Sequence, residues 1–224
     1  MNRSMAKKKL SRVVRKFAKD EKKFLTQMKG GKRNLDRPDF IWHALLGSFA
    51  TMGNSKGFSR LVKDQKNYNR ISFSTLKKLK TRRARKKRIQ EVCKGAGIRW
   101  PDRKAAWIID CFEMIQQLGG LKRTKDKLLS AQGRDDKMRF LRQFPGIGPK
   151  YSRDIMMDVY DKDFRNSIAL DTRVKSISKE LGLSFSTYEA EEDFFLDVAR
   201  EAGINGWELD RLLYWFRDDI RELL

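Results

Sequence analysis

The sequence predicts an all-α fold, and three observations support this prediction. Apolar residues recur every three or four positions in most segments, which is the period of an amphipathic helix. No long stretch alternates apolar and polar residues as a half-buried strand would. Glycine pairs at Gly30-Gly31 and Gly119-Gly120, with a break from Gly95 to Pro101, divide the chain into segments of helical length. We expect roughly ten helices and no repeat of solenoid period.

The charge balance favours nucleic acid as the partner. The 224 residues include 51 Lys and Arg against 29 Asp and Glu, a formal net charge of +22. Such an excess suits a polyanion, with an anionic membrane surface as the alternative. No apolar run approaches the roughly 20 residues of a spanning helix, and the start lacks a signal-peptide core. We therefore expect a soluble protein inside the cell, without a membrane partner. We further expect a monomer that associates with nucleic acid in the cytoplasm, nucleoid or nucleus.

The cysteines do not predict a metal site. Cys93 and Cys111 are the two in the chain, and they lack the CxxC spacing of zinc and iron–sulfur ligands. Two reduced, buried cysteines are the expected outcome.

Residues 1–35 are predicted to be a basic extension, followed by a domain over residues 36–224. Apolar positions at roughly helical spacing predict an amphipathic helix from Ser11 to Met28, which Gly30-Gly31 ends. Its basic face is either a nucleic-acid contact or a solvated surface.

The next segment is expected to be helical and strongly basic at its end. Asp39 can cap a helix that runs through the apolar stretch to Leu46, with His43 as a core or flanking histidine. A loop of small and polar residues follows. Helical fragments continue from Phe58 to Leu79, and the span 77–88 then holds nine basic residues in twelve. This block is either a phosphate contact or a solvated, partly mobile loop.

Further helices are predicted along the rest of the chain. Asp102 is a candidate cap for one whose apolar positions extend to Ile115. The others are expected over residues 135–144, 151–160, 170–181, 189–202 and 207–224.

A turn between two of these helices carries the chemical interest. It reads Phe144-Pro145-Gly146-Ile147-Gly148-Pro149-Lys150-Tyr151-Ser152. Glycine permits positive φ and close approach to the backbone, so Gly146 and Gly148 can present amides to a phosphate. Ile147 is expected to fill the space between the two helices.

This turn resembles the helix-hairpin-helix motif, and the chain resembles the helix-hairpin-helix/Gly-Pro-Asp superfamily of DNA glycosylases. The match comprises the hairpin from Phe144 to Lys150 and the later Leu170-Asp171-Thr172. The resemblance extends from about Phe40 to the C-terminus, with its specific part at residues 140–180. It implies a two-lobed helical fold with the hairpin at residues 140–160.

The resemblance also implies an enzyme that flips a nucleotide out of duplex DNA into a cleft. Lys150 would attack the sugar C1′ as a neutral amine, form a Schiff base and permit β-elimination. Asp171 would stabilise positive charge on the sugar and help to move protons. The alternative role of Lys150 is a plain contact to a phosphate, and the alternative role of Asp171 is a structural helix cap.

Other site residues follow from the same resemblance. Seven residues of the hairpin and of two further positions are expected to contact DNA: Gly146, Ile147, Gly148, Tyr151, Ser152, Arg173 and Asn54. Asn54 is also a candidate for filling the gap left by the flipped base, with Phe49 as the alternative. Arg173 stands where the family often has histidine. Base-pocket candidates are Trp42, Asp154, Trp215 and Phe216, although an ordinary core position is the favoured alternative for the three aromatic residues.

Many members of the endonuclease III branch carry four clustered cysteines near the C-terminus for an iron–sulfur cluster, and this chain has none there. Within the endonuclease III/8-oxoguanine glycosylase-like proteins, it therefore looks closer to cluster-free members such as 8-oxoguanine or alkyl-base glycosylases. No cofactor is expected, and a monovalent cation at the hairpin stays open. The predicted function is a base-excision repair glycosylase with abasic-site lyase activity on duplex DNA carrying a damaged base, an oxidised purine such as 8-oxoguanine being the first choice. The alternatives are a monofunctional alkylated-base glycosylase and a non-catalytic DNA-binding protein.

Overall fold

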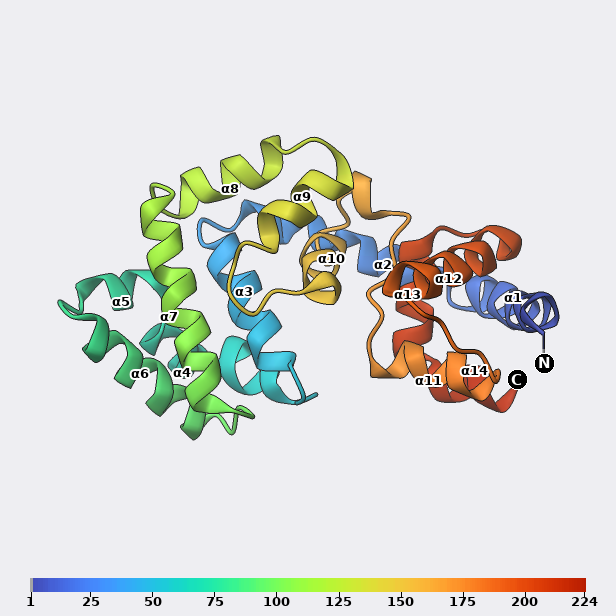
Figure 1. Ribbon diagram of the computed structural model, residues 1–224, viewed down its shortest axis with the longest axis horizontal. Coiled ribbons are helices and arrows are strands. Elements are labelled where there is room, and N and C mark those ends of the chain that lie inside the picture. The colour runs from blue at the N-terminus through green and yellow to red at the C-terminus, as the bar shows by residue number, and fades with distance from the viewer. Residues whose placement is uncertain (1) are drawn as a thin grey trace. The chain divides into compact units, whose positions relative to one another are not determined.

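The computed structural model describes residues 2–224, apart from the side chain of Lys32, and every regular element among them is helical (Figure 1). The predicted all-α class is therefore confirmed. The chain forms two compact units. Unit 1 combines the residues up to Arg33 with Met156–Leu224, and unit 2 is Asn34–Ile155. The unit boundaries fall inside η1 (Lys29–Asp36) and α10 (Pro149–Met157).

Unit 1 joins the two ends of the sequence. The basic N-terminal residues belong to this unit because Ala6, Leu10 and Val14 are fully buried and α1 packs against α12. Asn2 caps α1 through the Met5 amide, so this helix starts earlier than Ser11 and ends at Asp20. The elements of unit 1 are α1 (Arg3–Asp20), α2 (Lys22–Met28), η3 (Lys162–Phe164), α11 (Thr172–Glu180), α12 (Tyr188–Ala202), α13 (Gly206–Trp215) and α14 (Arg217–Glu222).

Unit 2 is built around α3, whose residues are apolar on nearly all sides and mostly buried. His43 on this helix lies edge-on to Phe58 and Tyr68, and burial lowers its pKa to about 4, as expected for a core histidine. The elements of unit 2 are α3 (Phe40–Thr51), η2 (Ser59–Lys63), α4 (Gln65–Arg70), α5 (Phe73–Lys78), α6 (Arg82–Gly95), α7 (Pro101–Gln117), α8 (Leu121–Ser130) and α9 (Gly133–Leu141).

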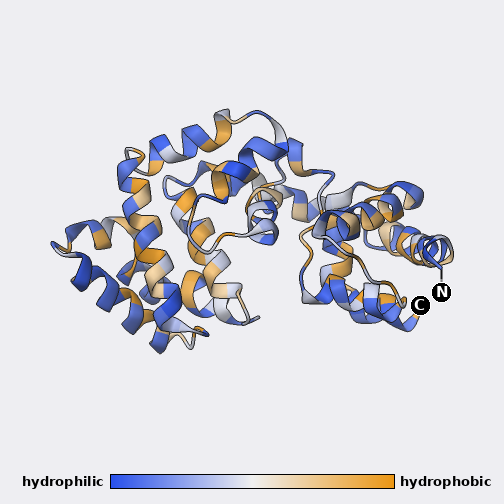
Figure 2. Ribbon diagram, viewed as in Figure 1, coloured by the Kyte–Doolittle hydropathy of each residue, from blue (hydrophilic) through white to orange (hydrophobic). Residues whose placement is uncertain are grey.

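The basic block at residues 77–88 is folded rather than a mobile loop. Its first residues end α5, and Thr81 caps α6 by accepting a hydrogen bond from the Ala84 amide at 3.1 Å. Ile89, Val92 and Cys93 bury the other side of α6, which packs against α7. Figure 2 shows hydrophilic residues concentrated where α5 meets α6.

No helix among residues 2–224 is both long and apolar enough to cross a membrane. Within the same residues, no cluster of three or more His, Cys, Asp and Glu side chains is arranged to hold a metal ion.

Candidate active site

The glycine-rich turn connects α9 to α10 in the way the sequence predicts. The amide of Ile147 donates to the Phe144 carbonyl at 3.0 Å and closes the turn. Phe144 is 1% exposed and Ile147 5% exposed, so both anchor the turn in apolar surroundings. Pro149 starts α10 at a position where the missing amide hydrogen costs nothing.

The two glycines of the turn have different roles. Gly146 has a φ of +83°, and a β-carbon there would lie 2.7 Å from the Trp107 ring and 2.9 Å from Phe49. At Gly148, a β-carbon would meet no atom within 4 Å. Gly146 is therefore required by the fold, whereas Gly148 leaves open space beside the backbone.

Both glycine amides suit an anion. Within residues 2–224, neither the Gly146 nor the Gly148 N–H donates to a protein acceptor. The positive end of α10 begins at the next residue, Pro149. Free amides at the start of a helix can bind an anion such as a phosphate.

Lys150 lies in the first turn of α10 with two of the other predicted residues. Its Nζ is 2.9 Å from Asp154 Oδ2 and 4.2 Å from the centre of the Tyr151 ring. The side chain of Lys150 is 25% exposed. The structure thus brings a partly accessible amine, a carboxylate and an aromatic ring together on one helix.

Ser152 is a correction to the predicted DNA contacts. The residue is fully buried, and its hydroxyl donates to the Pro149 carbonyl at 3.0 Å. Its amide donates to Gly148. Both of its donors therefore stabilise the first turn of α10 and are occupied there.

The extended segment before Asp171 is held by side chains. The Ile168 amide donates to Glu192 Oε1 at 3.0 Å, and the Ala169 amide donates to Asp210 Oδ1 at 2.8 Å. The Tyr188 hydroxyl accepts from the Leu170 amide and donates to the Ile168 carbonyl. Each of these backbone groups is thus satisfied without a neighbouring strand.

Asp171 caps α11 and still has one oxygen to offer. Its Oδ1 accepts from the amides of Arg173 and Val174 at 2.8 and 2.9 Å. Its Oδ2 accepts no hydrogen bond from the described part of the chain. Arg173 donates to the Tyr214 carbonyl at 2.9 Å, and its guanidinium lies 4.3 Å from the centre of the Tyr214 ring.

The aromatic base-pocket candidates divide into core and surface residues. Trp42 is a core residue, because it is fully buried, donates to the Ile71 carbonyl and packs against Phe73 and Phe112. Its proposed pocket role is thereby corrected. Trp215 is 55% exposed at the end of α13.

Phe216 is half-buried beside Phe17 and Phe24. Its ring supports the packing of α1 and α2 in unit 1. Trp215 is therefore the aromatic candidate with an open face.

Unit 2 contains a loop beside Asn54 that the sequence interpretation missed. Asn54, in the loop after α3, donates to the Gly97 carbonyl at 3.0 Å. Trp100 follows in that second loop with a φ of +54° and 51% exposure, and the Arg99 guanidinium lies 4.4 Å from its ring centre. An exposed tryptophan directly before a proline, next to arginine, was the available signal. Of the two residues predicted to fill the gap left by the base, Phe49 is buried and Asn54 is partly exposed.

A buried lysine supports these loops. Lys104 is fully buried and donates to the Met52 carbonyl at the end of α3 at 2.7 Å. Burial lowers its pKa to about 8. Lys104 was not among the predicted site residues.

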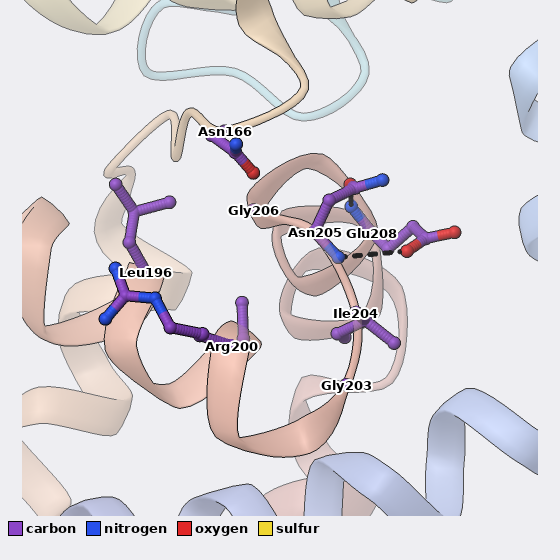
Figure 3. A pocket seen from close by; sticks show the side chains of 9 residues that line it. Asn166, Leu196, Arg200, Gly203, Ile204, Asn205, Gly206 and Glu208 are labelled. Carbon is purple, nitrogen blue, oxygen red and sulfur yellow. Dashed lines mark hydrogen bonds between the residues drawn. The ribbon is translucent and has the colours of Figure 1, made fainter.

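Unit 1 contains a cavity of about 540 Å³, and none of the predicted site residues lines it (Figure 3). It is lined by Asn166, Arg200, Asn205 and Glu208 among others. The Asn205 amide donates to Glu208 at 3.0 Å as part of the cap of α13, so Asn205 and Glu208 serve that helix.

Comparisons with solved structures identify the architecture. The crystal structure of the 8-oxoguanine DNA glycosylase of Thermotoga maritima matches with a TM-score of 0.71 at 17% identity, over 95% of this chain and 97% of that chain. The corresponding enzyme of Methanocaldococcus jannaschii matches with a TM-score of 0.71 at 16% identity, over 98% of each chain. The chain has the fold of these glycosylases.

The match covers nearly the whole chain, and its helical fold agrees with the fold that the resemblance implied. No protein-family model and no curated protein matches the sequence. The identification of the fold therefore depends on the three-dimensional arrangement.

Replacement of Gly146 should distinguish the two glycines. We expect Gly146→Ala to lower the free energy of unfolding by roughly 2–4 kcal/mol, through left-handed strain and overpacking. The matched control Gly148→Ala should change it by less than about 0.5 kcal/mol. Urea unfolding measures both, and equal effects of the two variants would contradict the assigned roles.

Lys104 should make stability depend on pH. The folded pKa is about 8 and the ordinary value is 10.5, so between these values the unfolded chain binds more protons and stability rises with pH. The penalty for burying the charge is complete below pH 8. Relative to wild type, Lys104→Met should gain roughly 1–3 kcal/mol more at pH 7 than at pH 10. Urea unfolding at the two pH values measures the difference in free energy of unfolding between the variant and wild type. An equal difference at pH 7 and pH 10 would exclude this role of Lys104.

Proposed function

We propose that the protein is a DNA glycosylase that removes a damaged base from duplex DNA and then cleaves the abasic site. The proposal depends chiefly on one observation: a glycine hairpin followed by Lys150, with Asp171 capping α11, in a chain that has the fold of two 8-oxoguanine DNA glycosylases. An oxidised purine such as 8-oxoguanine is the proposed base. Double-stranded DNA is the proposed partner.

In the proposed reaction, the target nucleotide leaves the base stack before any bond is broken. The amides of Gly146 and Gly148 hold a backbone phosphate near the target nucleotide. The buried side chain of Ile147 keeps the turn in place. Asn54 and Arg173 provide further contacts, and the exposed Arg99–Trp100 pair extends the contact surface in unit 2. Tyr151 supports the lysine side chain.

The chemical step requires a neutral amine. Lys150 attacks C1′, the bond to the base breaks, and the base leaves with the bonding electrons and gains a proton. Opening of the sugar ring gives an iminium, and loss of a C2′ proton expels the 3′ phosphate. Asp171 Oδ2 is the open carboxylate oxygen that would stabilise the positive charge on the sugar.

One contact favours an alternative. The ion pair between Lys150 and Asp154 favours the charged amine, which suits phosphate contact better than nucleophilic attack. A monofunctional glycosylase for alkylated bases, with Lys150 holding DNA, is therefore the second candidate. In a bifunctional enzyme, Asp154 would instead hold the amine until the substrate is bound.

Loss of the Asp171 charge should slow base release. Asparagine caps a helix about as well as aspartate, so Asp171→Asn should keep the fold while the single-turnover rate falls at least about tenfold. Asp171→Ala, which lacks both the charge and the cap, serves to separate the two effects. An Asp171→Asn rate equal to that of wild type would exclude a role in the reaction.

Lys150 is tested by covalent trapping. Wild-type protein with borohydride and duplexes that each carry one defined lesion should give a covalent complex, and Lys150→Gln should abolish it while duplex binding persists. Lys122→Gln, at an exposed position, should trap normally. If wild type releases a base without ever trapping, the monofunctional alternative is correct.

A further inference from the structure

The positive charge of the chain is distributed unevenly between its two units. Unit 2, residues 34–155, contains 29 Lys and Arg against 11 Asp and Glu, a net charge of +18. Unit 1 contains 22 against 18, a net charge of +4. The excess that points to a polyanion is therefore almost entirely a property of unit 2.

Within unit 2, the charge concentrates between η2 and the end of α6. Residues 58–95 contain 14 Lys and Arg, and Asp64 and Glu91 are their two acidic residues, which leaves a net charge of +12. The Asp64 carboxylate is used as the cap of α4. This span is far more basic than the rest of the unit.

Several of these cations lie exposed where α5 meets α6, and we call Lys77, Lys78, Lys80, Arg83 and Lys87 the α5–α6 surface. None of the five has an acidic partner in the part of the chain that the structure describes. By contrast, Arg82 pairs with Asp110 and Glu113. The surface thus keeps its charge available for another molecule.

The arrangement is unfavourable for the protein alone. Arg83 and Lys87 are four residues apart on α6, where like charges repel. The first turn of α6 contains basic residues and no acidic one, although the positive end of a helix favours anions. An external anion along this surface would relieve both repulsions.

The side chains also indicate which anion fits. The large exposed apolar residues of the described chain are Met5, Trp100, Leu129, Trp215 and Leu223, and none lies between residues 58 and 95. Membrane insertion and stacking on unpaired bases both require such side chains. Arg83 and Lys87 are separated by about 6 Å along the helix axis. This separation is close to the axial rise over two phosphate steps along one strand of a DNA duplex.

We propose that the α5–α6 surface binds the phosphate backbone of undamaged duplex DNA, independently of sequence and of the hairpin. In Figure 1, α7 lies between the α5–α6 corner and the turn that leads into α10. The surface is therefore a second DNA contact of unit 2, and it requires neither Lys150 nor Asp171. Such a contact holds the protein on DNA between lesions.

The test compares two variants of the full-length protein that lose the same charge from different units. The first is Lys77→Gln/Lys78→Gln/Arg83→Gln/Lys87→Gln. The control is Lys8→Gln/Lys9→Gln/Arg12→Gln/Lys16→Gln, on the exposed face of α1. Binding to an undamaged 30-base-pair duplex is measured as a function of salt, with circular dichroism and thermal unfolding to verify the fold.

The first variant should bind the duplex at least about tenfold more weakly near 0.1 M salt, with the slope of log K against log salt reduced by about 2–4. The control should remain within about threefold of wild type. Equal losses in the two variants would make the effect one of total charge and overturn the proposal. Duplex binding by the first variant equal to that of wild type would also overturn the proposal. Binding to phosphatidylglycerol vesicles and to single-stranded RNA is measured in parallel, and a loss confined to either of these ligands would overturn the proposal as well.

This outcome is separable from catalysis. The duplex contains no lesion, so a protein without glycosylase activity can still confirm the surface. Conversely, the first variant could release a damaged base at the normal rate and bind the undamaged duplex as well as wild type does. That result would refute the proposed DNA contact of the α5–α6 surface and leave the proposed function intact.

Discussion

The close packing of Gly146 is the constraint on which the candidate site depends. Its positive φ and the lack of room beside Trp107 and Phe49 fix the path of the backbone out of α9. That path starts α10 at Pro149 and puts Lys150 in its first turn, with Asp154 one turn further on. Any side chain at residue 146 would have to displace two aromatic rings, so the position of the lysine is linked directly to the core of unit 2.

Unit 1 holds Asp171 by a different means. Three side chains, Glu192, Asp210 and Tyr188, bind the backbone of residues 168–170 and replace the partner strand that an extended segment would need. Glu192 and Asp210 are 2% and 4% exposed, and a buried carboxylate is tolerated because it accepts a backbone hydrogen bond. Lys150 and Asp171 are therefore each positioned by contacts within their own unit.

The fold and the hairpin could be predicted from the sequence because both depend on local patterns. Helical spacing and glycine breaks predicted the all-α class. The residue pattern from Phe144 to Lys150 predicted the turn and the burial of Ile147. Burial of single residues was less predictable. Ser152 looked available for DNA, yet its hydroxyl is buried against its own helix.

Long-range packing explains the other differences. Trp42 is a core residue because α5 and α7 bring Phe73 and Phe112 against it, which no local pattern reveals. The pairing of Asn54 with Gly97 joins loops 43 residues apart, so the exposed Trp100 beside them was not recognised. The joining of both chain ends in unit 1 likewise depends on α1 packing against α12.

The most direct test of the central claim is to identify the residue that carries the sugar after borohydride reduction on an 8-oxoguanine duplex. Proteolysis and tandem mass spectrometry would locate the adduct. We expect it on Lys150 alone. An adduct on another amine, such as that of Lys104, whose pKa burial lowers to about 8, would contradict the assignment. Base release without any adduct would contradict the lyase mechanism.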